Sequence, residues 1–207
     1  MIKGLYAITP DMPDTEALLV KVGLALEGGA AVVQYRSKNA DVALRHEQAS
    51  ELAALCRDFH VPLIINDDLR LADLVNADGV HLGKDDGTTV KEARMILGPD
   101  RIIGISCYAD FARALLADRE GADYVAFGSF FPSPTKPDAV PASPGLLRQA
   151  KTRLHLPVVA IGGITLDNSG TLIDAGADAV AVISALFDSP DIRITAAAFA
   201  AKFATRH

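Results

Sequence analysis

The amino-acid sequence predicts a (β/α)8 TIM barrel, an α/β fold made by a single domain over residues 1–207. Three observations predict it: eight short apolar runs follow one another, helix-like segments separate them, and a small glycine-alanine motif recurs before several runs. Half of the 207 residues are hydrophobic, which is enough for one substantial core. Strands of a parallel barrel are buried on both faces, so uninterrupted apolar runs suit them.

The eight apolar runs have the length and composition of fully buried strands. They are rich in valine, isoleucine and aromatic residues, and most end in glycine or a polar residue. In chain order they are LYAIT from Leu5, AVVQYR from Ala31, PLIIND from Pro62, GVHLG from Gly79, IIGISC from Ile102, YVAFGS from Tyr124, VVAIGG from Val158 and AVAVIS from Ala179.

Helix signals lie between these runs. An apolar stripe with i, i+3, i+4, i+7 spacing predicts a helix before the third run, and it comprises Leu52, Leu55, Cys56 and Phe59. Thr89 and Glu92 have the spacing of a capping box, which predicts a helix start before the fifth run. Ser143-Pro144 is typical of an N-cap followed by proline in the first turn.

A weak internal repeat supports the alternation of helix and strand. Gly29, Gly121 and Gly176 each begin a glycine-alanine pair just before a predicted strand, and Asn76-Ala77 is a variant. Glycine readily takes the left-handed conformation that ends a helix. Eight strands, seven intervening helical segments and a helical tail favour a closed barrel over an open sheet.

Bulk properties narrow the class of function. The net charge of −6 and pI of about 5.3 argue against a nucleic-acid partner. No apolar stretch approaches the ~18 residues of a membrane span, and the first residues lack the pattern of a signal peptide. The two cysteines form neither a metal motif nor a disulfide framework. We therefore expect a cytoplasmic protein without a membrane partner, and a homo-oligomer is compatible with the sequence.

Carboxylates follow two neighbouring predicted strands, at the end of a barrel where active sites lie. Asp67 ends the third strand and Asp86 follows the fourth. Oxygen ligands of this kind suit Mg²⁺, which also binds substrate phosphates. The alternative is structural, with Asp67 or Asp68 capping the next helix and Asp86 solvating a loop. Spacing alone leaves both interpretations open.

Basic residues gather at the same predicted end although the chain is acidic overall. Arg36, Lys38, Lys84 and Lys136 all follow strands, and together they indicate a polyphosphate pocket. Each by itself is as easily explained as a solvated surface charge. Gly162-Gly163 and Ser184-Ala185 follow the last two strands, where such barrels often bind a phosphate on backbone N–H groups. His81 lies in mid-strand, so we favour a structural role for it.

Several of these strand ends, taken together, resemble the thiamine-phosphate synthase family over nearly the whole chain. The matching stretches are QYRSK from Gln34, IINDD ending at Asp68, GVHLGKDD from Gly79, GISC from Gly104, GSFFPSPTK from Gly128, AIGGI from Ala160 and GADAVAVISAL from Gly176. The chain departs from the family pattern at Lys84, where glutamine is usual, and at Ser133, where threonine is usual.

The resemblance implies a Mg²⁺-dependent transferase that joins an aminopyrimidine carrying a methyl diphosphate to a thiazole phosphate. It implies that Asp67 and Asp86 are the metal ligands, and that Arg36, Ser106 and Lys136 serve catalysis. The pyrimidine diphosphate would be bound by Gln34, Tyr35, Arg36, Ser37, Lys38, Asn66, Ser106 and Lys136. The thiazole phosphate would be bound by Ser133, Pro134, Thr135, Gly163, Ile183 and Ser184.

Two other functions compete with this expectation. One is a thiazole tautomerase-like isomerase on the same barrel, which typically lacks the metal-binding aspartates. The other is a non-catalytic barrel that senses a phosphorylated ligand, and such a protein would have no use for a second anion site beside a metal site. Release of diphosphate in the presence of Mg²⁺ separates all three.

Overall fold

Eight parallel strands close into a barrel in which each strand pairs with its neighbours in the sequence and β1 pairs with β8. The computed structural model describes residues 2–83, 87–132 and 142–204. All eight predicted strands are confirmed, and so is the TIM barrel. The strands are β1 (Gly4–Ile8), β2 (Val32–Tyr35), β3 (Leu63–Asn66), β4 (Gly79–Leu82), β5 (Ile102–Tyr108), β6 (Tyr124–Phe127), β7 (Val158–Ile161) and β8 (Ala179–Val182).

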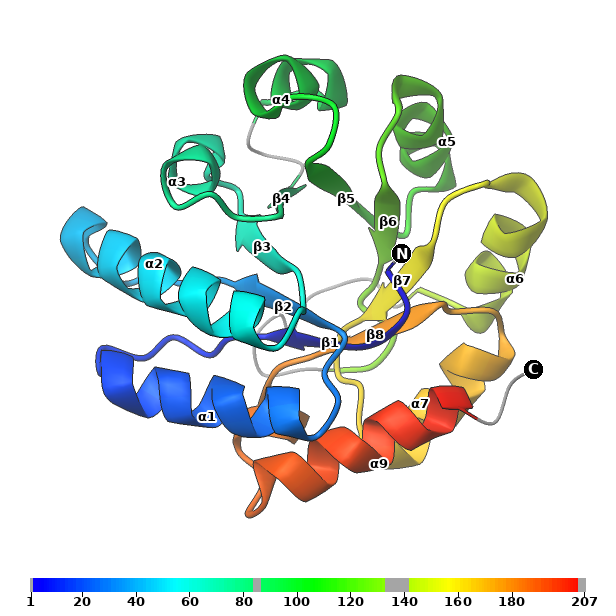
Figure 1. Cartoon of the computed structure of the whole chain (residues 1–207). Coiled ribbons are helices and arrows are strands. Elements are labelled where there is room, and N and C mark those ends of the chain that lie inside the picture. The colour runs from blue at the N-terminus through cyan, green and yellow to red at the C-terminus, as the bar shows by residue number, and fades with distance from the viewer. Residues whose placement is uncertain (1, 84–86, 133–141, 205–207) are drawn as a thin grey trace.

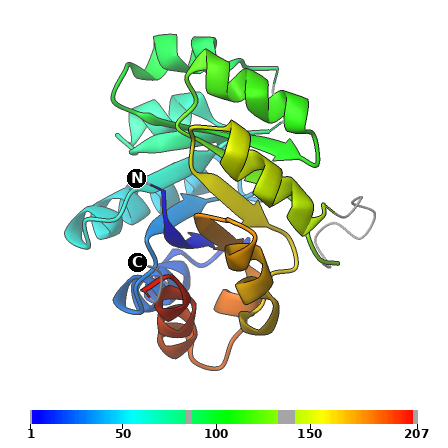
Figure 2. The same ribbon diagram turned by 90° about the vertical axis from the view of Figure 1, so that its right-hand side faces the viewer.

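Helices surround the barrel, as Figures 1 and 2 show from two directions. The last helix packs against α1, α7 and β1 and so covers the seam between the first and last strands. The helices are α1 (Thr15–Glu27), α2 (Val42–Asp58), α3 (Leu69–Leu74), α4 (Val90–Leu97), α5 (Phe111–Glu120), α6 (Pro144–Arg153), α7 (Leu166–Asp174), α8 (Ser184–Phe187) and α9 (Ile192–Ala204).

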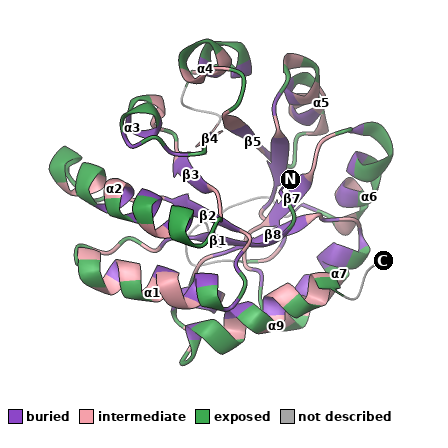
Figure 3. Cartoon of the chain, in the orientation of Figure 1, coloured by how far each residue is buried: buried purple, intermediate pink, exposed green. Residues whose placement is uncertain are grey.

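Alternation along the strands divides the core into two layers. In β1, Leu5 and Ala7 pack outward against the helices, whereas Tyr6 and Ile8 belong to a separate cluster inside the barrel. Successive side chains of a strand point to opposite faces, so every strand feeds both layers. Figure 3 shows the result, with buried strands at the centre and helices exposed on their outer sides. No helix within the described ranges has the length and apolar character needed to cross a membrane.

The repeat before the strands builds the turns at the amino end of the barrel. Gly29, Gly121 and Gly176 have φ of 94°, 85° and 110°, and Asn76 has φ of 54°. These are left-handed conformations, as the sequence predicts. Three of these turns continue into an aspartate whose side chain accepts the backbone N–H at the start of the preceding strand. The bonds are Leu63 to Asp78 at 2.8 Å, Ile103 to Asp123 at 2.7 Å and Val158 to Asp178 at 2.8 Å.

Two of these aspartates also carry an ion pair. Arg94 Nη2 lies 2.7 Å from Asp123 Oδ2, and Lys151 Nζ lies 2.9 Å from Asp178 Oδ1. Each of these two aspartates thus joins a strand to a cation on a helix at the amino end of the barrel.

The predicted helix starts are confirmed, and one predicted stripe is wrong at its end. Thr89 and Glu92 form the capping box of α4, and Ser143 is the N-cap of α6 without a side-chain hydrogen bond. Phe59 is 40% exposed instead of buried. Phe59 is the C-cap of α2, one residue beyond its end at Asp58, and the chain leaves the helix through His60 with φ of 57°.

Candidate active site

The segment that follows β2 is held in place by residues that follow β1. Thr9 Oγ1 accepts the backbone N–H of Arg36 at 2.9 Å and donates to its carbonyl oxygen at 3.3 Å. Asp11 accepts the backbone N–H of Lys38 at 2.7 Å. These bonds fix the backbone and leave the side chain of half-buried Arg36 and that of exposed Lys38 to act at the carboxyl end of the barrel.

The end of β3 brings three polar residues to the same region. Asp67 has φ of 63°, a conformation that turns the chain sharply after Asn66. The Asn66 side-chain amide donates to Asp67 Oδ2 at 2.5 Å and orients that carboxylate. Asp68 is the N-cap of α3 and accepts the backbone N–H of Leu71 at 2.9 Å. The two interpretations of this pair therefore separate: Asp68 caps the helix, and Asp67 does not.

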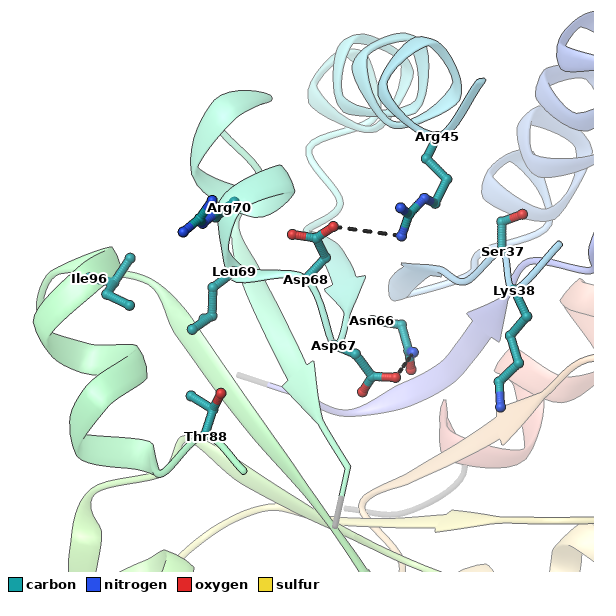
Figure 4. A pocket seen from close by; sticks show the side chains of 10 residues that line it. All are labelled: Ser37, Lys38, Arg45, Asn66, Asp67, Asp68, Leu69, Arg70, Thr88 and Ile96. Atoms are coloured by element: carbon teal, nitrogen blue, oxygen red, sulfur yellow. Dashed lines mark hydrogen bonds and ion pairs between the residues drawn. The ribbon is translucent and has the colours of Figure 1, made fainter. Parts of the chain in front are cut away.

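A pocket of about 560 Å³ lies beside this turn. Figure 4 shows Lys38 and Arg45 on one side of it, Asp67 and Asp68 between, and Arg70 and Ile96 on the other side. Arg45 Nη1 is 3.7 Å from Asp68 Oδ2, an ion pair that helps close the wall. The lining is Ser37, Lys38, Arg45, Asn66, Asp67, Asp68, Leu69, Arg70, Thr88 and Ile96.

Sequence reasoning found Ser37, Lys38, Asn66 and Asp67 in this pocket but missed its arginines. Arg45 lies in the first turns of α2 and Arg70 in the first turn of α3. The carboxyl ends of the strands precede the amino ends of the helices, so first-turn positions of α2 and α3 face the same rim. That position is the signal that was available in the sequence.

At the end of β5, Ser106 lies on a part of the strand that faces into the barrel, since Ile105 and Cys107 both pack in the outer layer. Arg113 of α5 fixes this strand end. Its Nε donates to the Ser106 carbonyl oxygen and its Nη2 to the Gly83 carbonyl oxygen, each at 2.8 Å. One guanidinium therefore joins the ends of β4 and β5 and holds Ser106 in register.

The glycine pair after β7 is packed against the segment that leaves β6. A Cβ at Gly162 would lie 2.0 Å from Ser129 Oγ, and one at Gly163 would lie 2.5 Å from the Pro132 carbonyl oxygen. Both glycines also have positive φ, 102° and 63°. The close approach of the chain itself is thus sufficient to require glycine at 163, so a side chain placed there would disturb the fold as well as any bound phosphate.

The end of β8 carries the remaining predicted phosphate residues. Ile183 packs against the cluster inside the barrel, and exposed Ser184 begins the short helix α8. The first turn of a helix presents N–H groups that have no acceptor in a preceding turn. Because β7 pairs with β8, the turn at Gly163 lies beside Ile183 and Ser184.

A polar network, which sequence reasoning missed, fills part of the barrel interior. The Tyr6 and Tyr124 hydroxyls are 2.7 Å apart, Gln34 Nε2 donates to the Tyr6 hydroxyl at 2.9 Å, and His81 Nδ1 lies 2.9 Å from the Tyr124 hydroxyl. Burial raises the pKa of both tyrosines, so their hydroxyls stay protonated. The structural role expected for His81 is consistent with this bond.

The side chain of Tyr35 points away from the barrel interior. It is 2% exposed, belongs to the outer layer, and donates its hydroxyl hydrogen to Gln48 Oε1 of α2 at 2.8 Å. Gln34 and Arg36 lie on either side of it in the chain, and alternation along β2 sends Tyr35 to the opposite face. A ligand in the barrel could reach only its backbone.

Part of the predicted site lies outside the described residues. This holds for the metal ligand Asp86, for Lys84, and for Ser133, Pro134, Thr135 and Lys136. Within residues 2–83, 87–132 and 142–204, no three His, Cys, Asp or Glu side chains gather closely enough to hold a metal ion. The Mg²⁺ site therefore stays a prediction, with Asp67 as its described member.

A parallel barrel with a charged pocket at the carboxyl ends and glycine turns after β7 is typical of enzymes that act on phosphorylated small molecules. Comparison with known proteins makes the class specific. The family model described as thiamine monophosphate synthase matches residues 5–186. The chain belongs to the thiamine-phosphate synthase family, as its strand-end motifs predict.

Close relatives support this membership over nearly the whole chain. A thiamine-phosphate synthase from Thiobacillus denitrificans is 63% identical over 194 residues, which are 94% of this chain and 92% of the relative. One from Nitrosospira multiformis is 56% identical over 202 residues, 98% of this chain and 86% of the relative. The solved structure of thiamine phosphate pyrophosphorylase from Pyrococcus furiosus has a TM-score of 0.86 at 36% identity, covering 97% of this chain and 95% of the other.

Proposed function

We propose that this chain, acting as one domain over residues 1–207, makes thiamine phosphate from two phosphorylated precursors. It couples an aminopyrimidine that carries a methyl diphosphate to a thiazole phosphate and releases diphosphate. Besides membership of the family, the observation that carries this proposal is the pocket beside β3. There a carboxylate oriented by Asn66 lies with two basic side chains, Lys38 and Arg45, at the carboxyl end of a barrel.

The reaction breaks the bond between the methylene carbon and the diphosphate oxygen, and the bonding electrons leave with the diphosphate. The electron-rich aminopyrimidine stabilises the resulting cation, and the thiazole nitrogen supplies the electron pair for the new C–N bond. Such a step needs neutralisation of charge on the leaving group and alignment of the nucleophile. A strong protein base is not required, so the absence of a base among the proposed catalytic residues is consistent with the chemistry.

We propose that the negative charge of the leaving diphosphate is neutralised or hydrogen-bonded by residues that follow β2 and β6 and by one residue within β5. Arg36 can bind diphosphate oxygens through two N–H groups, and Lys38 supplies a point charge. Ser106 donates a hydroxyl hydrogen from inside the barrel, where Arg113 holds its backbone. Lys136 completes the set as a residue that lies outside the described part of the chain. We place Gln34 against the pyrimidine ring, since its amide lies inside the barrel.

The residues at β3 fit a magnesium ion. Asp67 is exposed in the pocket, offers only oxygen ligands and is held by the Asn66 amide. We propose that Asp67 and Asp86 hold Mg²⁺. When bound, this ion supplies positive charge to the diphosphate oxygens.

The thiazole phosphate is placed on the other side of the mouth, at the ends of β7 and β8. Gly163, Ile183 and Ser184 lie on adjacent strands, and backbone N–H groups at the start of α8 suit a phosphate. Ser133, Pro134 and Thr135 are the remaining proposed ligands. Substrates this highly charged do not cross membranes unaided, so we propose action in the cytoplasm, on small molecules and not on nucleic acid or membranes, alone or as a homo-oligomer.

The experiment is to mix the purified chain with both precursors and follow thiamine phosphate and diphosphate. We expect both products in equal amounts, with the rate dependent on Mg²⁺. Conversion of a thiazole isomer without diphosphate release would instead indicate the tautomerase. Binding without turnover would indicate the sensor, and either result would overturn the proposal.

A further inference from the structure

The interior network runs across the barrel and not along one wall of it. Gln34 lies on β2, Tyr6 on β1, Tyr124 on β6 and His81 on β4. Tyr6, Gln34 and Tyr124 are 1%, 3% and 0% exposed, whereas His81 is half-buried. Four polar side chains from four strands therefore meet beneath the mouth, in the layer that a ligand inside the barrel would rest upon.

Gln34 Nε2 donates to the Tyr6 hydroxyl oxygen, and the Tyr6 and Tyr124 hydroxyl oxygens are 2.7 Å apart. One donor order gives every hydroxyl hydrogen in this network an acceptor: Tyr6 donates to Tyr124, and Tyr124 donates to Nδ1 of His81, 2.9 Å away. A buried hydroxyl hydrogen without an acceptor is costly, so this order satisfies both tyrosines. With this order, the Nε2–H tautomer of His81 is the one that leaves Nδ1 free to accept.

Packing holds the two tyrosine rings in place. The Tyr124 ring stacks on the His81 ring at 5.6 Å between centroids and is tilted by 59° to the Tyr6 ring at 5.9 Å. It also lies on Gly104 of β5, where a Cβ would come within 2.4 Å of the Tyr124 hydroxyl oxygen. The absence of a side chain at Gly104 thus leaves the space that the Tyr124 ring occupies inside the barrel.

We propose that Tyr6 and Tyr124 are positioning residues of the active site: their hydroxyls fix the Gln34 amide so that its carbonyl oxygen and remaining N–H face the pyrimidine ring. This inference rests on the proposed function. An aminopyrimidine presents a ring nitrogen acceptor next to an amino donor, and a carboxamide matches that pair with one donor and one acceptor, as it does with adenine. Because one N–H of the Gln34 amide donates to Tyr6, the amide can present its carbonyl oxygen and its other N–H to a ligand in only one orientation.

The kinetic test uses Tyr6→Phe and Tyr124→Phe, which remove a hydroxyl and keep the ring. For each we expect the KM for the pyrimidine diphosphate to rise about tenfold, a loss of ~1.4 kcal/mol, while the KM for the thiazole phosphate changes less than about twofold. Ser169→Ala is the matched control, since Ser169 is fully buried in α7 and its hydroxyl donates only to its own helix at Leu166. It should leave both KM values unchanged.

A double variant separates positioning from loss of stability. In a Gln34→Met background, Tyr6→Phe should have no additional effect, because the amide it orients is gone. Equal rises in both KM values, or a Tyr6→Phe effect that persists undiminished beside Gln34→Met, would overturn the inference.

A measurement without substrate keeps this inference distinct from the proposed function. The ¹⁵N shifts of His81 in the ligand-free protein report which ring nitrogen carries the proton. We expect the Nε2–H form in the wild type and a loss of that preference in Tyr124→Phe. The Nδ1–H form in the wild type would overturn the donor order and with it the inference, whereas a wild type that binds neither precursor would overturn the function itself.

Discussion

Aspartates at the two ends of the barrel include members with different surroundings. At the amino end, Asp123 and Asp178 each accept a backbone N–H of a strand and an ion pair from a helix. At the carboxyl end, Asp67 is exposed in a pocket and oriented by the neighbouring Asn66 amide. The same residue type therefore holds strands together at one end of the barrel and lines a pocket at the other.

The two kinds of aspartate differ in which hydrogen-bond donors would lose their acceptor if the carboxylate were removed. An aspartate that accepts a strand N–H leaves that buried donor unsatisfied when it is replaced, and this destabilises the fold. Asp67 is exposed, and its hydrogen bond with the Asn66 amide is exposed as well, so its replacement should destabilise the fold less. Stability and activity should therefore separate between the two ends of the molecule, as they do in barrel enzymes generally.

The largest expected effect is at the carboxyl end. Asp67→Asn should lower kcat by about 100-fold or more, equivalent to ~2.7 kcal/mol in the barrier, because it removes a charge that we propose holds Mg²⁺. The melting temperature should stay within a few degrees, since asparagine tolerates the positive φ at this position. Full activity at low Mg²⁺ would show that Asp67 is not a metal ligand and would break the comparison.

At the amino end we expect a smaller effect, on stability and not on activity. Asp178→Ala should lower the free energy of unfolding by about 2 kcal/mol, because the buried Val158 N–H loses its acceptor. Denaturant unfolding measures this, and kcat and KM should be unchanged. Lys151→Ala removes only the partly exposed ion pair and should cost less than ~1 kcal/mol. If the two variants were equally destabilised, the ion pair and not the strand bond would be the stabilising element.

The smallest effect is expected where the chain departs from its family. Lys84→Gln should change the KM for the pyrimidine diphosphate by less than about threefold, under ~0.7 kcal/mol, because the family usually has glutamine here. Kinetics at low and moderate salt provide the measurement. A tenfold rise in this KM that grows at low salt would instead indicate that the Lys84 ammonium contacts the diphosphate, and it would sharpen the contrast between the two ends.

Local signals were sufficient to predict the barrel. All eight strands start and end close to the predicted apolar runs, because a strand buried on both faces must be apolar along its whole length. The turn residues were equally readable, since Gly29 and Asn76 adopt the left-handed conformation that their types favour. The prediction that Phe59 lies in the apolar stripe was wrong. The sequence gives no strong helix stop at Asp58, and the positive φ of His60 is unusual for that residue type.

The site was harder to predict because its geometry depends on contacts between distant residues. Tyr6 and Tyr124 are separated by 118 positions, and no spacing rule joins them. Arg45 reaches the pocket from a helix, a place that a search of strand ends does not cover. The family motif includes Tyr35, but only the face of β2 on which it lies shows that its side chain packs outward. Sequence position thus located the mouth of the barrel, and three-dimensional packing decided which side chains enter it.

The two cysteines give the molecule a chemical property that its enzymology does not reveal. Cys56 and Cys107 are both unpaired and buried in the outer core layer, and burial raises the pKa of each thiol to about 12. At pH 8 these thiols stay protonated, so alkylating reagents and mild oxidants find little thiolate. A single cysteine introduced on the rim of the pocket would therefore be labelled selectively in an otherwise native chain, and a fluorophore there would report ligand binding directly.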